Sequence, residues 1–173
     1  MEPRFAVVVF PPADAVAAAE EFRRLHDPLF HKIAAHVAVV PALSWRTCEE
    51  GLPRLVEAVV AAGRGPFPVN LSGAGRTKDG TVFVKVDEGA GPLGEWNARL
   101  VAALGPPESM EFPPFVPVMG IGRAPTVSEA EFLQRQLAGH LAPVRFSVEH
   151  LSFVVEDARG LWVEKERLPL VVA

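Results

Sequence analysis

The fold is decided by a short stretch that reads HVAVVP over residues 36–41. Side chains along a strand alternate between its two faces, so Val37 and Val39 point to one side while His36 and Ala38 point to the other. The two valines suit a core, which predicts that His36 lies on a less buried face that a ligand can reach. The alternative is a histidine at a strand start that hydrogen-bonds a backbone carbonyl.

Strand-like and helix-like segments alternate on both sides of this stretch. Apolar, β-branched runs predict strands at 5–10, 36–40, 67–71, 81–87, 115–122, 145–155 and 161–168. Helical patterns cover 15–25, 49–62, 93–104 and 128–137. Asp14 and Ser128 are expected to cap the first and last helices. The Gly-rich residues 73–76 are expected to form a plain hairpin connection, since they match no phosphate-binding fingerprint.

The second half of the chain repeats the order of the first. A shift that places residues 36–39 on 115–118 also places 67–69 on 146–148, with Glu50 on Glu129. This single shift aligns predicted strands with strands and helices with helices, although few residues are identical between the two halves. We therefore expect an α+β fold of two pseudo-symmetric lobes of antiparallel sheet, with helices outside and a central cleft, in a single domain over residues 1–173.

Composition excludes several classes of protein. The formal net charge is −4 and the pI is about 5.7, which argues against bulk nucleic-acid binding. Cys48 is the single cysteine, so no cysteine-based zinc site is expected, and Pro28 keeps His26 and His31 off one helix face. No apolar run approaches membrane-spanning length, and the first residues do not resemble a signal peptide. A cytoplasmic protein without a metal or a membrane partner is expected, and its oligomeric state stays open.

Several segments together resemble the two-histidine phosphoesterases, the family that includes bacterial 2'-5' RNA ligase-like proteins and 2',3'-cyclic phosphodiesterases. FAVVVFPP at 5–12 is similar to the first strand of that family, and IAAHVAV at 33–39 to the run into its first His-x-Thr/Ser motif. FPPFVPV at 112–118 occupies the place of the second motif. The ending at 146–170 is similar to the closing hairpin. The resemblance spans nearly the whole chain and implies the same duplicated, two-lobed fold.

The resemblance implies phosphoester chemistry on RNA ends or cyclic nucleotides, with no cofactor. In the family, one histidine accepts a proton, the other donates one, and two hydroxyl side chains hold the phosphate. His36 is retained as the expected catalytic residue. Ala38 replaces the first hydroxyl residue, Phe115 the second histidine and Pro117 the second hydroxyl residue. A positioned acid or base contributes roughly 10²–10⁴-fold, so we expect this chemistry to be impaired.

Other residues are candidate replacements for the missing groups. His150, in a late strand, is an auxiliary imidazole if that strand approaches the cleft. Four basic residues are candidate phosphate ligands, although each also fits a solvated surface charge: Arg76, Lys78, Lys85 and Arg123.

Three functions follow as alternatives. The protein binds a small nucleotide, an RNA end or another small ligand without catalysis, or it is a phosphoesterase with His36 as a lone acid or base. The third is a partner-binding scaffold whose cleft has become an apolar pocket lined by Phe115, Pro117 and Met119.

Overall fold

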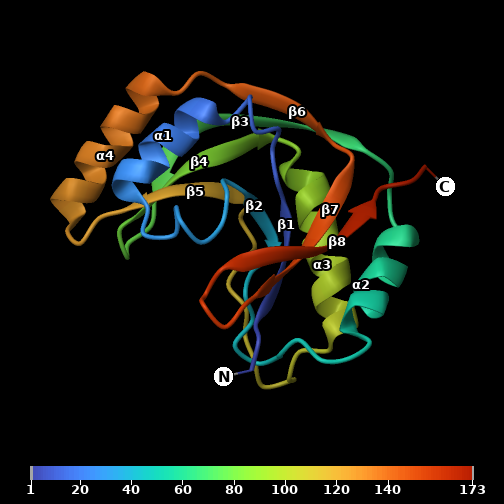
Figure 1. Cartoon of the computed structure of the whole chain (residues 1–173). Coiled ribbons are helices and arrows are strands. Elements are labelled where there is room, and N and C mark those ends of the chain that lie inside the picture. The colour runs from blue at the N-terminus through green and yellow to red at the C-terminus, as the bar shows by residue number, and fades with distance from the viewer. Residues whose placement is uncertain (1, 173) are drawn as a thin grey trace.

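A computed structural model describes residues 2–172 as a curled antiparallel sheet of eight strands with four helices (Figure 1). The strands are β1 (Phe5–Val9), β2 (Val37–Val40), β3 (Phe67–Arg76), β4 (Thr81–Glu88), β5 (Val118–Arg123), β6 (Val144–Val148), β7 (His150–Glu156) and β8 (Trp162–Pro169). The helices are α1 (Ala17–His26), α2 (Leu52–Ala61), α3 (Ala90–Leu104) and α4 (Val127–His140). The expected α+β, two-lobed class is confirmed, with both lobes built on a single sheet.

The two lobes are related by a pseudo-twofold axis between the central strands. The sheet order is β6-β3-β4-β5-β2-β1-β7-β8, so β5 and β2 are neighbours at its centre. Helix α1 joins β1 to β2 but packs on β5, and α3 joins β4 to β5 but packs on β2. Figure 1 shows the resulting pairs, α1 beside α4 and α3 beside α2. Each lobe therefore receives a helix from the other.

Alternation along the central strands separates the core from an open face. Val37, Val39 and Met119 are fully buried on the side that the helices cover. Trp96 and Leu100 of α3 contribute to the same core. The remaining alternate positions carry His36 and its neighbours on the opposite side of the sheet. The hydrophobic pattern therefore fixes which side of each central strand can meet a ligand.

Two predicted segments differ in the structure. The strand expected at 145–155 is interrupted at Glu149: β6 pairs with β3 in one lobe, whereas β7 pairs with β1 in the other. The expected connection at 73–76 lies inside β3, because the turn to β4 comes later, at 77–80. Both differences reflect tertiary pairing, which local patterns do not encode.

The predicted helix caps also differ. Helix α1 begins at Ala17 after Val16, with no side-chain cap, so Asp14 lies in the preceding turn. The cap of α4 is Thr126, whose hydroxyl accepts a 3.3 Å hydrogen bond from the backbone N–H of Glu129. The capping box therefore starts two residues earlier than Ser128 predicts. None of the helices within residues 2–172 has the length and apolar character needed to cross a bilayer.

Candidate functional site

Strand pairing identifies the positions of the two lobes that correspond to each other. β2 and β5 run antiparallel with Val37 opposite Met119. An axis between this pair places His36 across from Gly120 and Ala38 across from Val118. These four residues share one face of the sheet, because Val37 and Met119 point into the core. We call this side the open face.

By this pairing, residues 118–120 are the β5 counterparts of residues 36–38, the stretch expected for the second motif position. The shift found in the sequence places it at Phe115 and Pro117, which precede β5. Pro117 is buried, and Phe115 is half-buried beside a cavity that also contacts Ala38. Met119 lies on the core face instead, so Phe115, Pro117 and Met119 do not line a common pocket. Segment 105–117 carries no strand or helix, and residue counting across such a segment cannot fix register.

His36 is held in one tautomer immediately before β2. Its Nδ1 lies 2.8 Å from the carbonyl oxygen of Ala34, and a carbonyl only accepts, so Nδ1 carries the proton. Burial lowers the pKa of His36, against the hydrogen bond to Ala34, which raises it. The neutral ring then has its lone pair on Nε2, as a general base requires. The ring of Phe10 packs edge-on against it, with centroids 6.2 Å apart.

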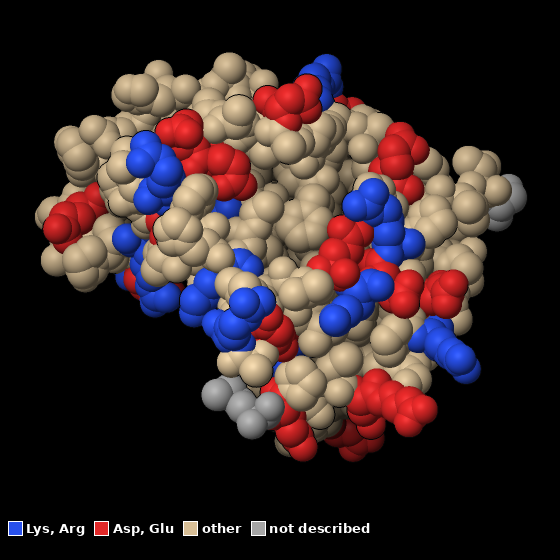
Figure 2. All heavy atoms as spheres, viewed as in Figure 1, with Lys and Arg blue, Asp and Glu red and all other residues tan. Residues whose placement is uncertain are grey.

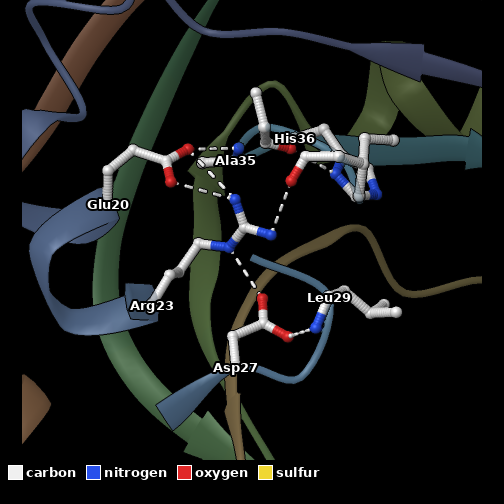
Figure 3. Close-up of polar contacts among 8 residues, drawn as sticks. Glu20, Arg23, Asp27, Leu29, Ala35 and His36 are labelled. Atoms are coloured by element: carbon white, nitrogen blue, oxygen red, sulfur yellow. Dashed lines mark hydrogen bonds and ion pairs between the residues drawn. The ribbon is translucent and has the colours of Figure 1, made fainter. Parts of the chain in front are cut away.

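A buried arginine on α1 organises the segment that leads to His36. Arg23 is 1% exposed. Figure 3 shows its guanidinium between Glu20 and Asp27, with Nε 2.7 Å from Asp27 and Nη1 3.0 Å from Glu20. Its Nη2 donates to the carbonyl oxygen of Ile33 at 2.8 Å. All three nitrogens of the guanidinium therefore have partners, as a buried cation requires.

The two carboxylates extend this network into the backbone on either side of the loop. Asp27 accepts from the backbone N–H of Leu29 at 2.9 Å, and Glu20 accepts from that of Ala35 (Figure 3). Residues 27–35 are thus tied to α1 at both ends. His36 follows directly, so Arg23 is a positioning residue for the imidazole. Sequence reasoning missed it, because an arginine in a charged helix predicts an exposed side chain.

The other three motif positions carry no polar side chain. Ala38 and Val118 are half-buried. Gly120 is exposed, and a Cβ built there would meet no atom within 4 Å. At these four positions the open face therefore carries one imidazole, that of His36, with open space at Gly120 and the apolar side chains of Ala38 and Val118 beside it. The other three residues have no side-chain group that accepts or donates a proton.

The structure separates the four basic residues that sequence analysis selected. Arg76 is turned toward α4, where it pairs with Glu131 at 2.9 Å. Arg123 pairs with Asp79 at 3.4 Å, and Lys78 is exposed in the same turn. Lys85 shares the open face, since it lies opposite Val118 in the β4–β5 ladder.

The side chain of Lys85 leans away from His36. Its Cδ and Cε lie 3.7 and 3.3 Å from the points where Gly73 and Gly75 would carry a Cβ. Both glycines belong to β3, on the far side of β4 from β5. The absence of a side chain at Gly75 chiefly makes room for the ring of Phe83, whose nearest atom is 2.5 Å from that Cβ position, and Lys85 packs beside it. The flexible amine must swing back to reach a ligand at His36.

His150 lies on the same face as His36 but two strands away. It begins β7 and shares its side with Val154, which clusters with Ala6 and Val8 of β1. Val8 is opposite Ala38, so this side is continuous with the open face. Burial, followed by the charge of Arg167, lowers the pKa of His150. Strand spacing puts about 10 Å between the two strands, and β1 lies between them.

Neither the face drawn in Figure 2 nor the acidic side chains of residues 2–172 indicate a polyanion or metal site. Figure 2 shows charged residues of both signs around a central area that is mostly uncharged, rather than a broad basic region. Within residues 2–172, no three His, Cys, Asp or Glu side chains are grouped to hold a metal ion.

Comparison with known proteins places this geometry in a family. Escherichia coli LigT, solved with 3'-AMP, is similar with a TM-score of 0.70 and 16% identity, covering 99% of each chain. TT0787 of Thermus thermophilus has a TM-score of 0.61 and 21% identity, over 96% of this chain and 97% of that one. Kluyveromyces marxianus Usb1 has a TM-score of 0.54 and 14% identity, covering 97% of each chain. Among curated protein sequences, none matches. Residues 10–160 match the model of the 2'-5' RNA ligase superfamily, and the chain belongs to that superfamily.

Proposed function

We propose that this protein binds a phosphate-bearing ligand on the open face at His36 and that its phosphoester chemistry is strongly impaired. The observation that carries the proposal is the register of β2 and β5. This register, with Val37 opposite Met119, supports Ala38, Val118 and Gly120 as the counterparts of the remaining motif residues. A missing acid or base costs roughly 10²–10⁴-fold in rate. Each missing hydroxyl donor raises the activation free energy by about 2.7–4 kcal/mol, by analogy with oxyanion-hole donors.

Binding is supported by what is retained. The Nε2 atom of His36 is free to contact a ligand, and the Arg23 network holds the loop before it. Lys85 supplies a mobile cation on the same face. The superfamily and the LigT structures with phosphate and with 3'-AMP make inorganic phosphate and 3'-nucleotides the first ligands to test.

The test is binding and turnover measured on the same preparation. Calorimetry with phosphate, 3'-AMP and 2',3'-cyclic AMP, on the native protein and His36→Ala, should show binding that the substitution weakens, with little hydrolysis of the cyclic compound. Absence of binding by all three would overturn the proposal. Rapid hydrolysis that His36→Ala abolishes would instead support the second function, a phosphoesterase that works with His36 as its lone acid or base.

A further inference from the structure

A cavity opens at the end of the site where the polar motif residues are missing. Its volume is about 500 Å³, within the range of roughly 300–1,000 Å³ for small-molecule sites. Ala38 and Val118 both line it. The positions that correspond to a hydroxyl of one lobe and a histidine of the other have thus become part of an apolar wall.

The cavity lies where the two central strands diverge. Within residues 2–172, the ladder between β2 and β5 contains Val37 opposite Met119, and beyond it the strands separate. One face of α3, with Ala98 and Val101, closes the gap from one side. The segment from Phe112 to Val116 closes it from the other. The cavity therefore lies beside the end of the β2–β5 ladder, between α3 and the segment that precedes β5.

The residues that line the cavity disfavour a ligand with a polar ring, such as a nucleobase. No lining residue is charged, and the amide nitrogen of Asn97 already donates to the carbonyl oxygen of Val39 at 2.8 Å. Pro41, Pro113 and Pro114 line it as well and have no N–H to offer. A nucleobase placed there would leave its ring nitrogens and exocyclic groups without partners, which costs affinity. An uncharged hydrocarbon group loses nothing on entry and gains from leaving water.

We propose that this cavity binds the apolar part, an aryl or branched alkyl group, of a phosphate ester whose phosphate lies at His36. The inference rests on the proposed phosphate site, and it narrows the ligand to esters of apolar alcohols. His36 and Ala38 are two residues apart on one strand face, about 7 Å. A single ester linkage spans that distance, so a compact ligand can occupy both places.

The test uses 1-naphthyl phosphate, 1-naphthol, inorganic phosphate and 3'-AMP, with dissociation constants measured by calorimetry. Ala98→Phe fills the cavity from an exposed position of α3, and Ala58→Phe, exposed on α2 away from the cavity, is the matched control. We expect 1-naphthyl phosphate to bind at least about tenfold more tightly than phosphate. Ala98→Phe should remove that gain while leaving phosphate affinity and the melting temperature unchanged, and Ala58→Phe should change none of them.

The outcomes separate the two proposals. Equal affinity for 1-naphthyl phosphate and phosphate, or an Ala98→Phe variant that still shows the gain, overturns the cavity assignment. Tighter binding of 3'-AMP than of 1-naphthyl phosphate overturns the apolar ligand class. Binding of 1-naphthol that Ala98→Phe abolishes, with no contribution from phosphate, supports the cavity and overturns the phosphate site at His36.

Discussion

Gly120 lies across from His36 on the open face, and a Cβ built on it would meet no atom within 4 Å. The space that a second hydroxyl side chain would fill is therefore present without the side chain. Under the proposed function, the missing groups and the fold are separable, because the backbone that would carry those groups is in place. Substitutions at these positions should therefore add phosphoester chemistry without rebuilding the fold.

Reconstruction of the motifs should produce a phosphodiesterase. The triple variant Ala38→Thr, Val118→His, Gly120→Thr supplies the second acid or base and both hydroxyl donors. We expect hydrolysis of 2',3'-cyclic AMP to rise by at least about 10²-fold over the native protein. The rate is measured by chromatography of the nucleotide product.

The matched control carries the same groups at the positions that sequence shifting selects. Ala38→Thr with Phe115→His and Pro117→Thr should give no such rise, because residues 115 and 117 lie outside the β2–β5 pair. Equal activity of the two triple variants would contradict the assigned register.

Removal of the buried guanidinium should destabilise the protein strongly. Arg23→Met leaves the carboxylates of Glu20 and Asp27 without their cation, and breaking such a buried pair typically costs about 3–5 kcal/mol. Arg23→Lys keeps the charge but cannot make the hydrogen bonds to all three partners. Its free energy of unfolding should therefore lie between those of the native protein and Arg23→Met. Urea unfolding gives the free energies.

Arg24 provides the control on the same helix. Its ion pair with Glu21 is exposed, so Arg24→Met should change the free energy of unfolding by no more than about 0.5 kcal/mol. Similar losses for Arg23→Met and Arg24→Met would show that the network does not stabilise the fold.

Acidification should destabilise the protein partly through His36. Burial lowers the pKa of His36 in the folded state, so below the ordinary value of 6.5 the unfolded chain binds more protons than the folded one. Stability is therefore complete above that value and is lost as the pH falls toward the folded pKa. A difference of one bound proton between the two states changes the free energy of unfolding by at most about 1.4 kcal/mol per pH unit.

The corresponding variant is His36→Gln, compared with the native protein by urea unfolding at pH 7.5 and 5.5. The native protein should lose more stability than the variant between these values. His150, whose pKa burial also lowers, contributes to both proteins alike. Equal losses would show that His36 titrates as it does in the unfolded chain.

A glycine in the turn between β3 and β4 should resist substitution. Gly80 has φ +91°, and a Cβ there would lie 2.1 Å from the carbonyl oxygen of Ala124. Gly51 has φ +88° with no atom within 4 Å of its Cβ position. Both alanine variants incur about 1–2 kcal/mol from the left-handed conformation. Gly80→Ala should cost at least about 1 kcal/mol more, from the added clash. Equal unfolding free energies would contradict this.

Local sequence patterns determined much of the fold. Alternation in HVAVV placed Val37 and Val39 in the core and His36 on the other side, because side-chain direction in a strand depends only on parity. The spacing of apolar residues predicted helices at 49–62 and 128–137, which overlap α2 and α4. The resemblance to the family rested on segments that overlap or adjoin the strands. The proposal of His36 as the retained motif residue rests on that resemblance and needs no long-range information.

Tertiary structure alone decided which residues of β5 lie opposite β2 and what surrounds them. The pairing of Val37 with Met119 is a hydrogen-bonding register between distant segments, and the irregular segment before β5 hides it from residue counting. The burial of Arg23 depends on a loop that folds back over α1 and supplies the Ile33 carbonyl. The cavity beside Ala38 and Val118 is bounded by α3 and by residues 112–116, which lie far from β2 in the sequence, and no local pattern records that arrangement.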